Sequence, residues 1–156
     1  MRIWLIAVGT RMPDWVQTAY ADYAARLPHE CRLELVEIAP AQRGKNTDIA
    51  RAKQQEGEKI LKALPRDTTV IALDEHGQQL TSLEWSRELK GWMQSGRDTA
   101  LLIGGPDGHS PEVLARADRK WGLSKLTLPH ALVRVFVAEQ LFRAWSVLAN
   151  HPYHRA

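Results

Sequence analysis

Short apolar runs alternate with amphipathic segments along the whole chain. Five runs have the length and composition of buried strands, and they lie at Ile3–Val8, Leu33–Ile38, Thr69–Leu73, Ala100–Ile103 and Leu123–Leu128. The segments between them carry apolar residues at helical spacing. This alternation is typical of an α/β fold in which a mostly parallel sheet carries helices on both faces. At 156 residues, the chain is expected to form a single domain over residues 1–156.

Capping signals locate the ends of several predicted helices. Asp14 is expected to cap a helix that runs to about Leu27. The sequence TSLE at Thr81–Glu84 forms a capping box, and Gly96 suits the C-terminal end of the same helix. Ser110–Glu112 places a capping side chain before a proline at the first helical position.

The last predicted helix, from about Ala131 to Ala149, is apolar on nearly all of its sides. A helix that is apolar all round must be buried nearly all round. One sheet of a domain this small cannot cover it fully, so we expect a second subunit to cover the remainder, most simply in a two-fold homodimer. A monomer with a deeply inserted core helix is the alternative.

Composition bounds the class of protein without identifying it. Hydrophobic residues make up 44% and charged residues 25% of the chain, which is ordinary for a globular protein. The apolar run at the N-terminus is too short to span a bilayer and lacks the features of a signal peptide. We therefore expect a cytoplasmic protein with no membrane partner. The single cysteine, Cys31, has no neighbouring His or Cys that would indicate a metal site or a nucleophile.

The net charge of +3 is mildly basic, and its distribution is uneven. Lysine and arginine gather between Arg43 and Arg66, while Glu56 and Glu58 partly offset them. In the polar connection Ala39–Thr47, the residues Arg43-Gly44-Lys45 suit contact with phosphate, although a plain solvated loop explains them equally well. Charge alone thus permits a nucleic-acid partner without requiring one.

The strongest indication of a ligand is the segment LLIGGPDGHS at Leu101–Ser110. Its three glycines remove side chains where a strand ends, so that main-chain groups can approach a bound molecule. A second loop, LSKLTLPH at Leu123–His130, follows further along the chain. Turn geometry alone is the alternative explanation for a single loop of this kind.

Two common nucleotide-binding motifs are absent from the sequence. A P-loop needs a lysine and then Ser or Thr after its last glycine, whereas Gly108 precedes His109 and Ser110. A dinucleotide-binding fingerprint should follow the first strand, but Gly9 has no second glycine after it. Nucleotide hydrolysis and nicotinamide or flavin chemistry are therefore not expected.

Five motifs, in order along essentially the whole chain, closely resemble the ribosomal RNA large subunit methyltransferase H family. They are GTRMPDWV (9–16), RGKN (43–46), LLIGGPDG (101–108), LSKLTLPH (123–130) and AWSVLANHPYHR (144–155). The resemblance implies a SPOUT-class α/β fold with a C-terminal trefoil knot, and a homodimer. It also implies transfer of a methyl group from S-adenosylmethionine to N3 of a pseudouridine in 23S rRNA, within the large subunit or the assembled ribosome.

The resemblance further implies which residues contact the cofactor. They are Leu73, Gly104, Gly105, Leu123, Ser124, Lys125, Leu126, Thr127 and Leu128. Ordinary core and turn roles are the alternative for each of them, and for Leu126 we favour that alternative. The stretch DEHGQQ at Asp74–Gln79 departs from the proline-containing version that is usual in the family, which puts the shape of this loop in question.

Methyl transfer to an imide nitrogen needs positioning of the reactants and removal of the N3 proton. His130 follows the second loop directly and is a candidate base, whereas His154 and Arg155 in the tail are candidate substrate-facing residues. A structural or solvent-exposed role is the alternative for each. No histidine spacing indicates a metal site. A rival function keeps the dimer and the basic surface but drops catalysis, as in a ribosome-associated assembly factor, and binding of the cofactor would separate the two.

Overall fold

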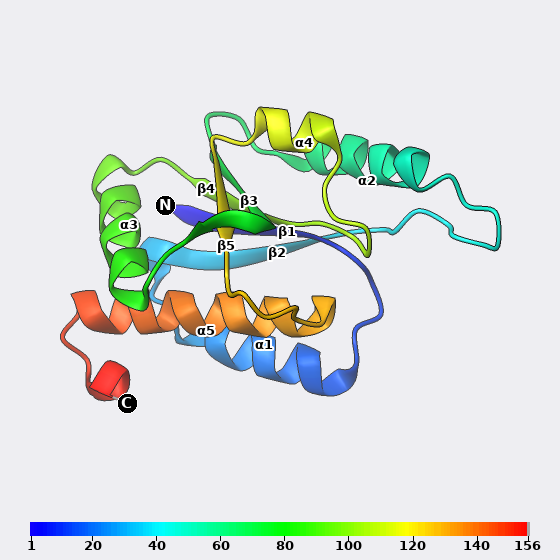
Figure 1. Ribbon diagram of the computed structural model, residues 1–156. Coiled ribbons are helices and arrows are strands. Elements are labelled where there is room, and N and C mark those ends of the chain that lie inside the picture. Colours follow the sequence, from blue (N-terminus) through cyan, green and yellow to red (C-terminus); the bar gives the residue numbers. More distant parts are fainter. Residues whose placement is uncertain (156) are drawn as a thin grey trace.

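A computed structural model of the chain, which describes residues 1–155, contains a five-stranded sheet with all strands parallel (Figure 1). The strand order is β2-β1-β4-β3-β5. The strands are β1 (Arg2–Val8), β2 (Arg32–Ile38), β3 (Thr69–Gln79), β4 (Thr99–Ile103) and β5 (Arg119–Gly122). The predicted α/β fold with a parallel sheet is confirmed. Ala156, the last residue of the predicted domain, lies outside the described residues.

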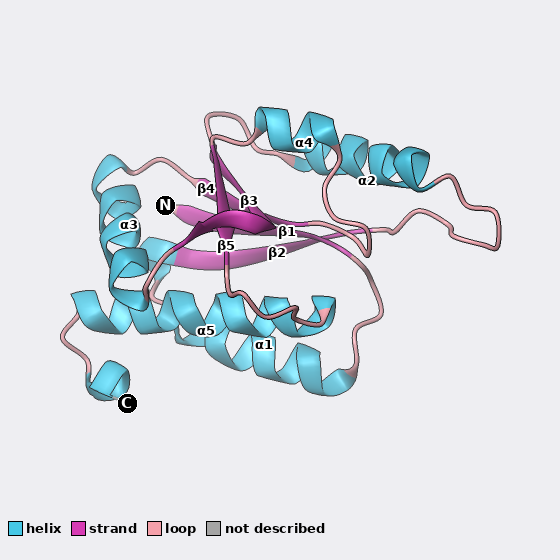
Figure 2. Cartoon of the chain, viewed as in Figure 1, coloured by secondary structure: helices cyan, strands magenta, loops and turns pink. Residues whose placement is uncertain are grey.

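Helices cover both faces of this sheet, as expected (Figure 2). One face carries α1 (Asp14–Arg26), α3 (Ser82–Ser95) and α5 (His130–Leu148), while the other carries α2 (Ile49–Ala63) and α4 (Pro111–Arg116). Successive side chains of a strand point to opposite faces. In β1, Leu5 therefore packs in the first layer and Ile6 in the second. Burial on both faces explains why the central strands are continuously apolar.

Parallel pairing brings the carboxyl ends of the strands to one edge of the sheet. Leu73 of β3 pairs with Ile103 of β4, and Ala7 of β1 pairs with Ile103 from the other side. The part of β3 after Leu73 and the segment that follows β4 therefore start side by side. This edge is where an open parallel sheet usually binds its ligand.

The prediction of a fifth strand at Leu123–Leu128 is wrong. The fifth strand is β5, four residues earlier, and Leu123–Leu128 forms a loop instead. β5 is an edge strand with exposed Arg119 and Lys120. Because these residues are charged, β5 contains no apolar run by which it could be predicted. Its one large apolar side chain, Trp121, is buried, and its ring lies 5.1 Å from that of Trp85.

β3 is longer than predicted, because it continues past Leu73 to Gln79. Its pairing with β5 shifts register between Leu73 and Gln78, so the intervening residues bulge from the ladder. A Cβ at Gly77 would lie 2.5 Å from the main chain of Trp121. The DEHGQQ stretch is thus an irregular strand, and Gly77 permits the close approach of β5.

Most of the predicted helix ends are confirmed. Thr81 and Glu84 form the reciprocal capping box of α3, which ends at Gly96 in the left-handed conformation. Ser110 caps α4 through its hydroxyl, as predicted. The assignment of Asp14 as a cap is wrong by one residue, because Pro13 occupies the N-cap position and Asp14 lies in the first turn of α1. A carboxylate there still interacts favourably with the helix dipole.

α5 packs against α1, α3 and the sheet, yet this chain does not bury it on all sides. Val137, Ala138 and Leu141 are fully buried, whereas Phe136 is 40% exposed and Leu148 is 37% exposed. Among the helices that the structure describes, we find none with the length and apolar content to cross a membrane.

Candidate functional site

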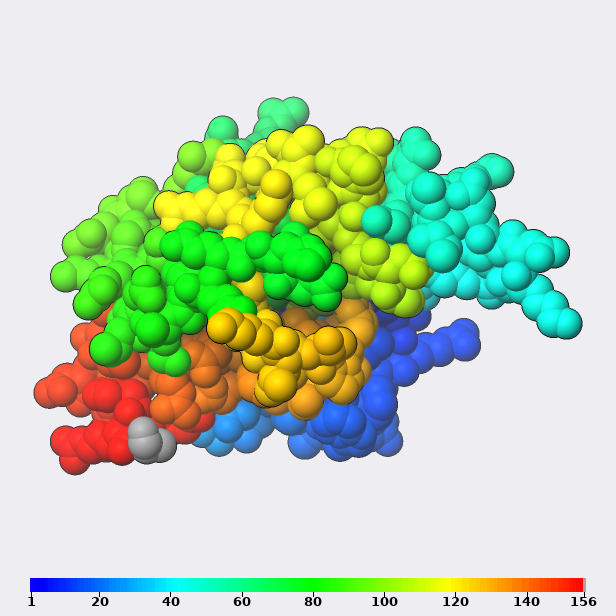
Figure 3. Space-filling view, in the orientation of Figure 1, coloured from blue at the N-terminus to red at the C-terminus, as the bar shows by residue number. Residues whose placement is uncertain are grey.

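A cavity of about 720 Å³ opens at the carboxyl edge of the sheet. Three segments enclose it: residues 73–76 of β3, the glycine loop (103–109) and the loop 123–128 before α5. Figure 3 views this face, where the golden loop 123–128 lies below the green residues of β3 and beside the yellow-green glycine loop. Segments from distant parts of the sequence therefore converge on one recess.

Eight of the nine predicted cofactor contacts line this cavity, and only Lys125 does not. The eight are Leu73, Gly104, Gly105, Leu123, Ser124, Leu126, Thr127 and Leu128. The structure therefore brings together residues that lie up to 55 positions apart in the sequence. Their role in holding a cofactor stays a prediction.

The glycine loop is a tight turn that larger residues could not form. The Gly108 N–H donates to the Gly105 carbonyl at 3.0 Å, and Gly108 has a φ of +85°. A Cβ at Gly104 would lie 2.8 Å from the main chain of Gly108. The loop thus presents bare main chain toward the cavity, which is what a closely held ligand requires.

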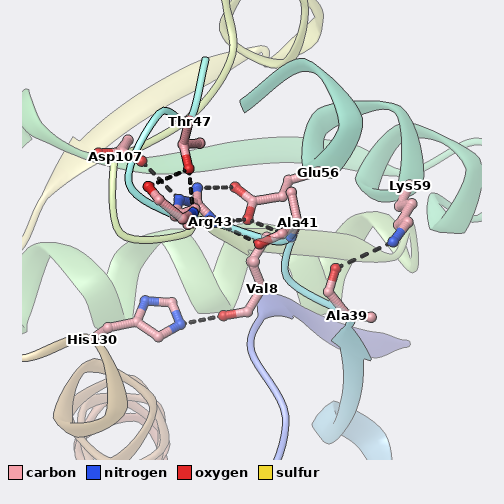
Figure 4. A network of polar contacts seen from close by, with 10 residues as sticks. Val8, Ala39, Ala41, Arg43, Thr47, Glu56, Lys59, Asp107 and His130 are labelled. Carbon is pink, nitrogen blue, oxygen red and sulfur yellow. Dashed lines mark hydrogen bonds and ion pairs between the residues drawn. The ribbon is translucent and has the colours of Figure 1, made fainter. Parts of the chain in front are cut away.

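The far side of the glycine loop rests on Glu56 of α2, which is only 2% exposed. Glu56 forms an ion pair with Arg43, and Arg43 forms a second ion pair with Asp107 of the glycine loop (Figure 4). Arg43 is therefore engaged inside the molecule, which disfavours the phosphate contact considered for it from the sequence. The sequence places Arg43 in the RGKN motif, but nothing in it indicates that the partners of Arg43 are Glu56 and Asp107.

The loop before α5 is stabilised locally and leaves an apolar side chain in solvent. The Ser124 hydroxyl accepts a hydrogen bond from the Leu126 N–H at 2.9 Å. Leu126 lines the cavity and is 74% exposed. Of the core and turn roles that we favoured for Leu126, the core role is wrong, because an exposed leucine at the mouth of a cavity has no core to pack in. The hydrogen bond to Ser124 is consistent with the turn role.

His109 lines the cavity, and sequence reasoning did not single it out. Its side chain is buried, and its Nε2–H donates to the Leu102 carbonyl at 3.1 Å. Burial lowers the pKa of His109 below its usual value, because the charged form would lose its hydration. A neutral His109 therefore belongs to the folded state.

Acidification is expected to destabilise the fold through His109. The unfolded chain takes up a proton near the usual His pKa of 6.5, whereas the folded chain resists doing so until a lower pH. The free energy of unfolding is thus unaffected above pH 6.5. Below pH 6.5 it decreases until the pH reaches the lowered pKa of His109 in the folded state. Thermal unfolding between pH 7.5 and 5 measures this loss. His109→Gln keeps a donor for Leu102 and should flatten the profile; identical profiles for the two proteins would contradict the assignment.

His130, the candidate base, also lines the cavity. Its Nε2 bonds to the Val8 carbonyl at the end of β1, which can only accept, so Nε2 carries the hydrogen and Nδ1 is free to accept a proton (Figure 4). Burial lowers the pKa of His130, with the nearby Arg134 acting in the same direction. A neutral imidazole is the form that a base requires.

Arg134, one turn further along α5, anchors the same end of the helix. It is only 2% exposed, donates to the Gly9 carbonyl at 2.8 Å and forms an ion pair with Glu37 at 2.6 Å. Together, His130 and Arg134 join the first turn of α5 to the end of β1. The start of α5, and with it the loop 123–128, is therefore held against the sheet.

The tail candidates, His154 and Arg155, lie at the opposite end of α5. They belong to the 3₁₀ turn Pro152–Arg155, which packs against the last turns of the helix. α5 has 19 residues, and its first and last Cα atoms are about 27 Å apart at the rise of an α-helix. Neither tail residue lines the cavity of its own chain. The structure thus does not bring the three candidate catalytic residues together within one chain.

Aromatic packing holds this tail in its place. The Tyr153 ring lies 4.6 Å from that of Phe142, and its hydroxyl donates to Glu139 at 3.1 Å.

Further side chains line the cavity besides the predicted contacts. Asp74, Glu75 and His76 belong to the DEHGQQ stretch whose shape the sequence put in question. Nothing in the sequence marks the others as more than core or surface residues, and they include Lys53, Leu114, Trp121 and Val133. Across residues 1–155, His, Cys, Asp and Glu form no group of three that could hold a metal ion.

Comparison with known proteins gives a consistent result over the full length. A family model described as "Predicted SPOUT methyltransferase" matches residues 1–154. The chain is 56% identical over 155 residues to the Ribosomal RNA large subunit methyltransferase H of Hydrogenovibrio crunogenus, and 59% identical over 155 residues to that of Thioalkalivibrio sulfidiphilus. Each alignment covers 99% of both chains.

Solved structures share the fold at low sequence identity. A probable methylase family protein from Haemophilus influenzae superposes with a TM-score of 0.59 at 15% identity, over 97% of this chain and 67% of that one. A putative methylase family protein from Neisseria gonorrhoeae gives a TM-score of 0.55 at 18% identity, over 90% of this chain and 81% of that one. At these identities, the likeness shows the architecture alone.

Proposed function

The chain belongs to the ribosomal RNA large subunit methyltransferase H family of SPOUT methyltransferases, and we propose on that basis that it methylates N3 of pseudouridine 1915 in 23S rRNA. S-adenosylmethionine is the methyl donor of SPOUT methyltransferases. The observation that carries this conclusion is identity of 56% or more to two such relatives over 99% of both chains.

The cavity at the carboxyl edge of the sheet fits this cofactor. Its volume of about 720 Å³ accommodates a nucleoside with its amino-acid arm. Leu73 and Leu128 offer apolar surface to a purine, and the glycine loop offers main-chain donors and acceptors. We therefore assign the eight lining residues to the cofactor and leave Lys125, which does not line the cavity, outside the contact set.

The bound cofactor supplies a methyl group on a sulfonium, which is already a good leaving group. The residues of this chain then have to orient the two reactants and remove the N3 proton of the base. His130 is placed for the second task, because it is neutral and keeps Nδ1 free while Nε2 is fixed on Val8. An arginine near N3 of the pseudouridine would stabilise the anion that forms when the N3 proton leaves. Arg155 is our candidate for that role.

A homodimer reconciles this role for Arg155 with its distance from the cavity. In one chain the tail and the cavity lie at opposite ends of α5, about 27 Å apart by helix length. Phe136 and Leu148 leave apolar surface on the outer side of α5, which a second copy would cover. We propose that His154 and Arg155 of each chain serve the cavity of its partner.

The trefoil knot is part of the same proposal. After the edge strand β5, the chain turns back below the sheet, and α5 packs between α1 and α3 (Figure 1). The loop 123–128 crosses the carboxyl edge of the sheet on this path, next to the glycine loop. This return of the chain toward its own earlier loops is what a knot at the cofactor site requires.

Mass analysis of ribosomal RNA tests the activity directly. Ribosomal particles that carry the unmethylated pseudouridine, incubated with the protein and labelled S-adenosylmethionine, should gain one labelled methyl group in 23S rRNA. We expect little transfer to a protein-free hairpin, because this small chain offers little surface of its own for reading RNA. Equal labelling of the hairpin would contradict the particle requirement. A folded protein that binds neither the cofactor nor its demethylated product would instead favour a non-enzymatic assembly factor.

A further inference from the structure

We propose that Arg43 and Glu56 are positioning residues that hold the glycine loop in its cofactor-binding shape from the side away from the cavity. The inference rests on the proposed function of the cavity. It makes the polar connection 39–47, which lines no part of the cavity, a component of the cofactor site. Figure 4 shows the contact: Arg43 lies between Glu56 of α2 and Asp107 of the glycine loop.

The bridge uses all three nitrogens of the Arg43 guanidinium. Nη1 donates to Glu56 Oε2 at 2.7 Å and Nη2 donates to Glu56 Oε1 at 3.0 Å. Nε donates to Asp107 Oδ2 at 3.0 Å. Nη1 also donates to the Ala41 carbonyl at 3.1 Å, and the Ala41 N–H donates to Glu56 Oε2 at 3.0 Å. Only the fork of an arginine satisfies a carboxylate on one edge and a second carboxylate on the other.

Burial makes the ion pair between Arg43 and Glu56 energetically costly to break. The Glu56 side chain is 3% exposed, and Arg43 is the cation that pairs with it. Hydrogen bonding to Glu56 raises the pKa of Arg43 further above its usual value. Removing the guanidinium would leave a buried carboxylate without its counter-charge, so Glu56 would have to move toward water or take up a proton.

Any movement of Glu56 passes directly to the cavity wall. A Cβ at Gly105 would lie 2.6 Å from Glu56 Oε1, so the carboxylate lies against the main chain of the glycine loop. The next residues, Pro106, Asp107 and Gly108, are exposed and gain no support from the core. The loop is therefore held by its own turn bond on one side and by Glu56 and Arg43 on the other.

The connection 39–47 is itself folded to present Arg43. The Thr47 hydroxyl donates to the Gly44 carbonyl at 2.8 Å and closes a turn just after Arg43. Lys45, two residues along, is exposed and forms no ion pair within the described residues. One basic residue of the loop is thus committed to the fold, while its neighbour remains available to solvent or to RNA.

Variants of Arg43 and Glu56 distinguish a role in positioning the glycine loop from a role in the stability of the fold alone. We expect Arg43→Gln to raise the Kd for S-adenosylhomocysteine and the KM for S-adenosylmethionine about tenfold, while kcat at saturating cofactor stays within about threefold. Arg43→Lys should bind more weakly than the wild type, because one ammonium cannot replace the fork. The double variant Arg43→Gln/Glu56→Gln should bind the cofactor better than Arg43→Gln alone, since no buried charge is left unpaired.

Lys45→Gln is the matched control, because it removes one positive charge from the same loop without touching the bridge. Its Kd for S-adenosylhomocysteine should equal that of the wild type. Calorimetric Kd values, thermal unfolding and hydrogen exchange at residues 104–109 are measured for all variants. Faster exchange in this loop of Arg43→Gln, with the wild-type exchange rate in β1, is the expected pattern.

Two results would overturn the proposal. One is a lower Tm for Arg43→Gln with an unchanged cofactor Kd, which makes the bridge purely structural. The other is an unchanged cofactor Kd with a raised KM for ribosomal particles, which makes Arg43 an RNA contact. If the wild-type protein binds no S-adenosylhomocysteine, the proposed function itself fails; if the wild type and Arg43→Gln bind it equally, only the present inference fails.

Discussion

A single methyl group at position 105 should cost the protein its cofactor. In Gly105→Ala, the new Cβ would lie 2.6 Å from Glu56 Oε1, well inside van der Waals contact. Glu56 cannot yield freely, because Arg43 and the Ala41 N–H hold both of its oxygens. The glycine loop must then shift into the cavity. We expect the Kd for S-adenosylhomocysteine to rise at least about thirtyfold, with a parallel loss in kcat/KM for S-adenosylmethionine.

Alanine is a sharper probe than a large residue such as Trp at this position. The Cβ at Gly105 points at α2 and not into the cavity, so an indole would separate α2 from the loop and unfold the region. Gly91→Ala is the control, since a Cβ there meets nothing within 4 Å and Gly91 lies inside α3. It should bind cofactor normally and gain about 0.5 to 1 kcal/mol of stability. Normal cofactor binding by Gly105→Ala would contradict the assignment of the glycine loop.

The strands that could be predicted from the sequence are those that contain an apolar run. The central strands β1 and β4 are almost wholly apolar, because a parallel sheet covered by helices selects such runs. β2, although an edge strand, still carries several leucine, valine and isoleucine residues, and β3 is apolar up to Leu73. β5 was missed because it is short and its first two residues, Arg119 and Lys120, are exposed and charged. The apolar run Leu123–Leu128 was mistaken for that strand. Its leucines line a cavity instead, and a cavity wall and a strand have the same composition.

Eight of the nine predicted cofactor contacts lie within two motifs of the family, LLIGGPDG and LSKLTLPH, so the resemblance could point to them. The bridge behind the glycine loop could not be predicted in this way, since it depends on long-range contacts. Arg43 and Asp107 are 64 residues apart, and a carboxylate such as Glu56, within a basic, amphipathic helix, looks like one of several surface charges. Only the packing of α2 against the glycine loop distinguishes Glu56 from Glu58. Whether a charged side chain is buried depends on the fold, and the local sequence does not show it.

The C-terminal tail should be needed for methyl transfer and not for cofactor binding. We expect deletion of residues 151–156 to lower kcat at least about a hundredfold, while the Kd for S-adenosylhomocysteine changes less than about threefold. The reason is distance: the tail lies at the far end of α5 from the cavity of its own chain. Deletion also removes Tyr153 from Phe142, so Arg155→Gln, which keeps that packing, is the cleaner variant and should show the same separation. Unchanged turnover in Arg155→Gln would remove Arg155 from the mechanism.

Mixed dimers test whether the tail acts on its own chain or on the partner. Gly105→Ala chains have an intact tail and a damaged cavity, whereas Arg155→Gln chains have the reverse. If the tail serves the partner, a dimer of one chain of each kind pairs an intact cavity with an intact tail, and co-refolding the two variants restores activity well above either alone. If each tail served its own chain, no site in the mixture would be complete. Absence of recovered activity, with mixed dimers demonstrated by mass, would therefore exclude the shared site.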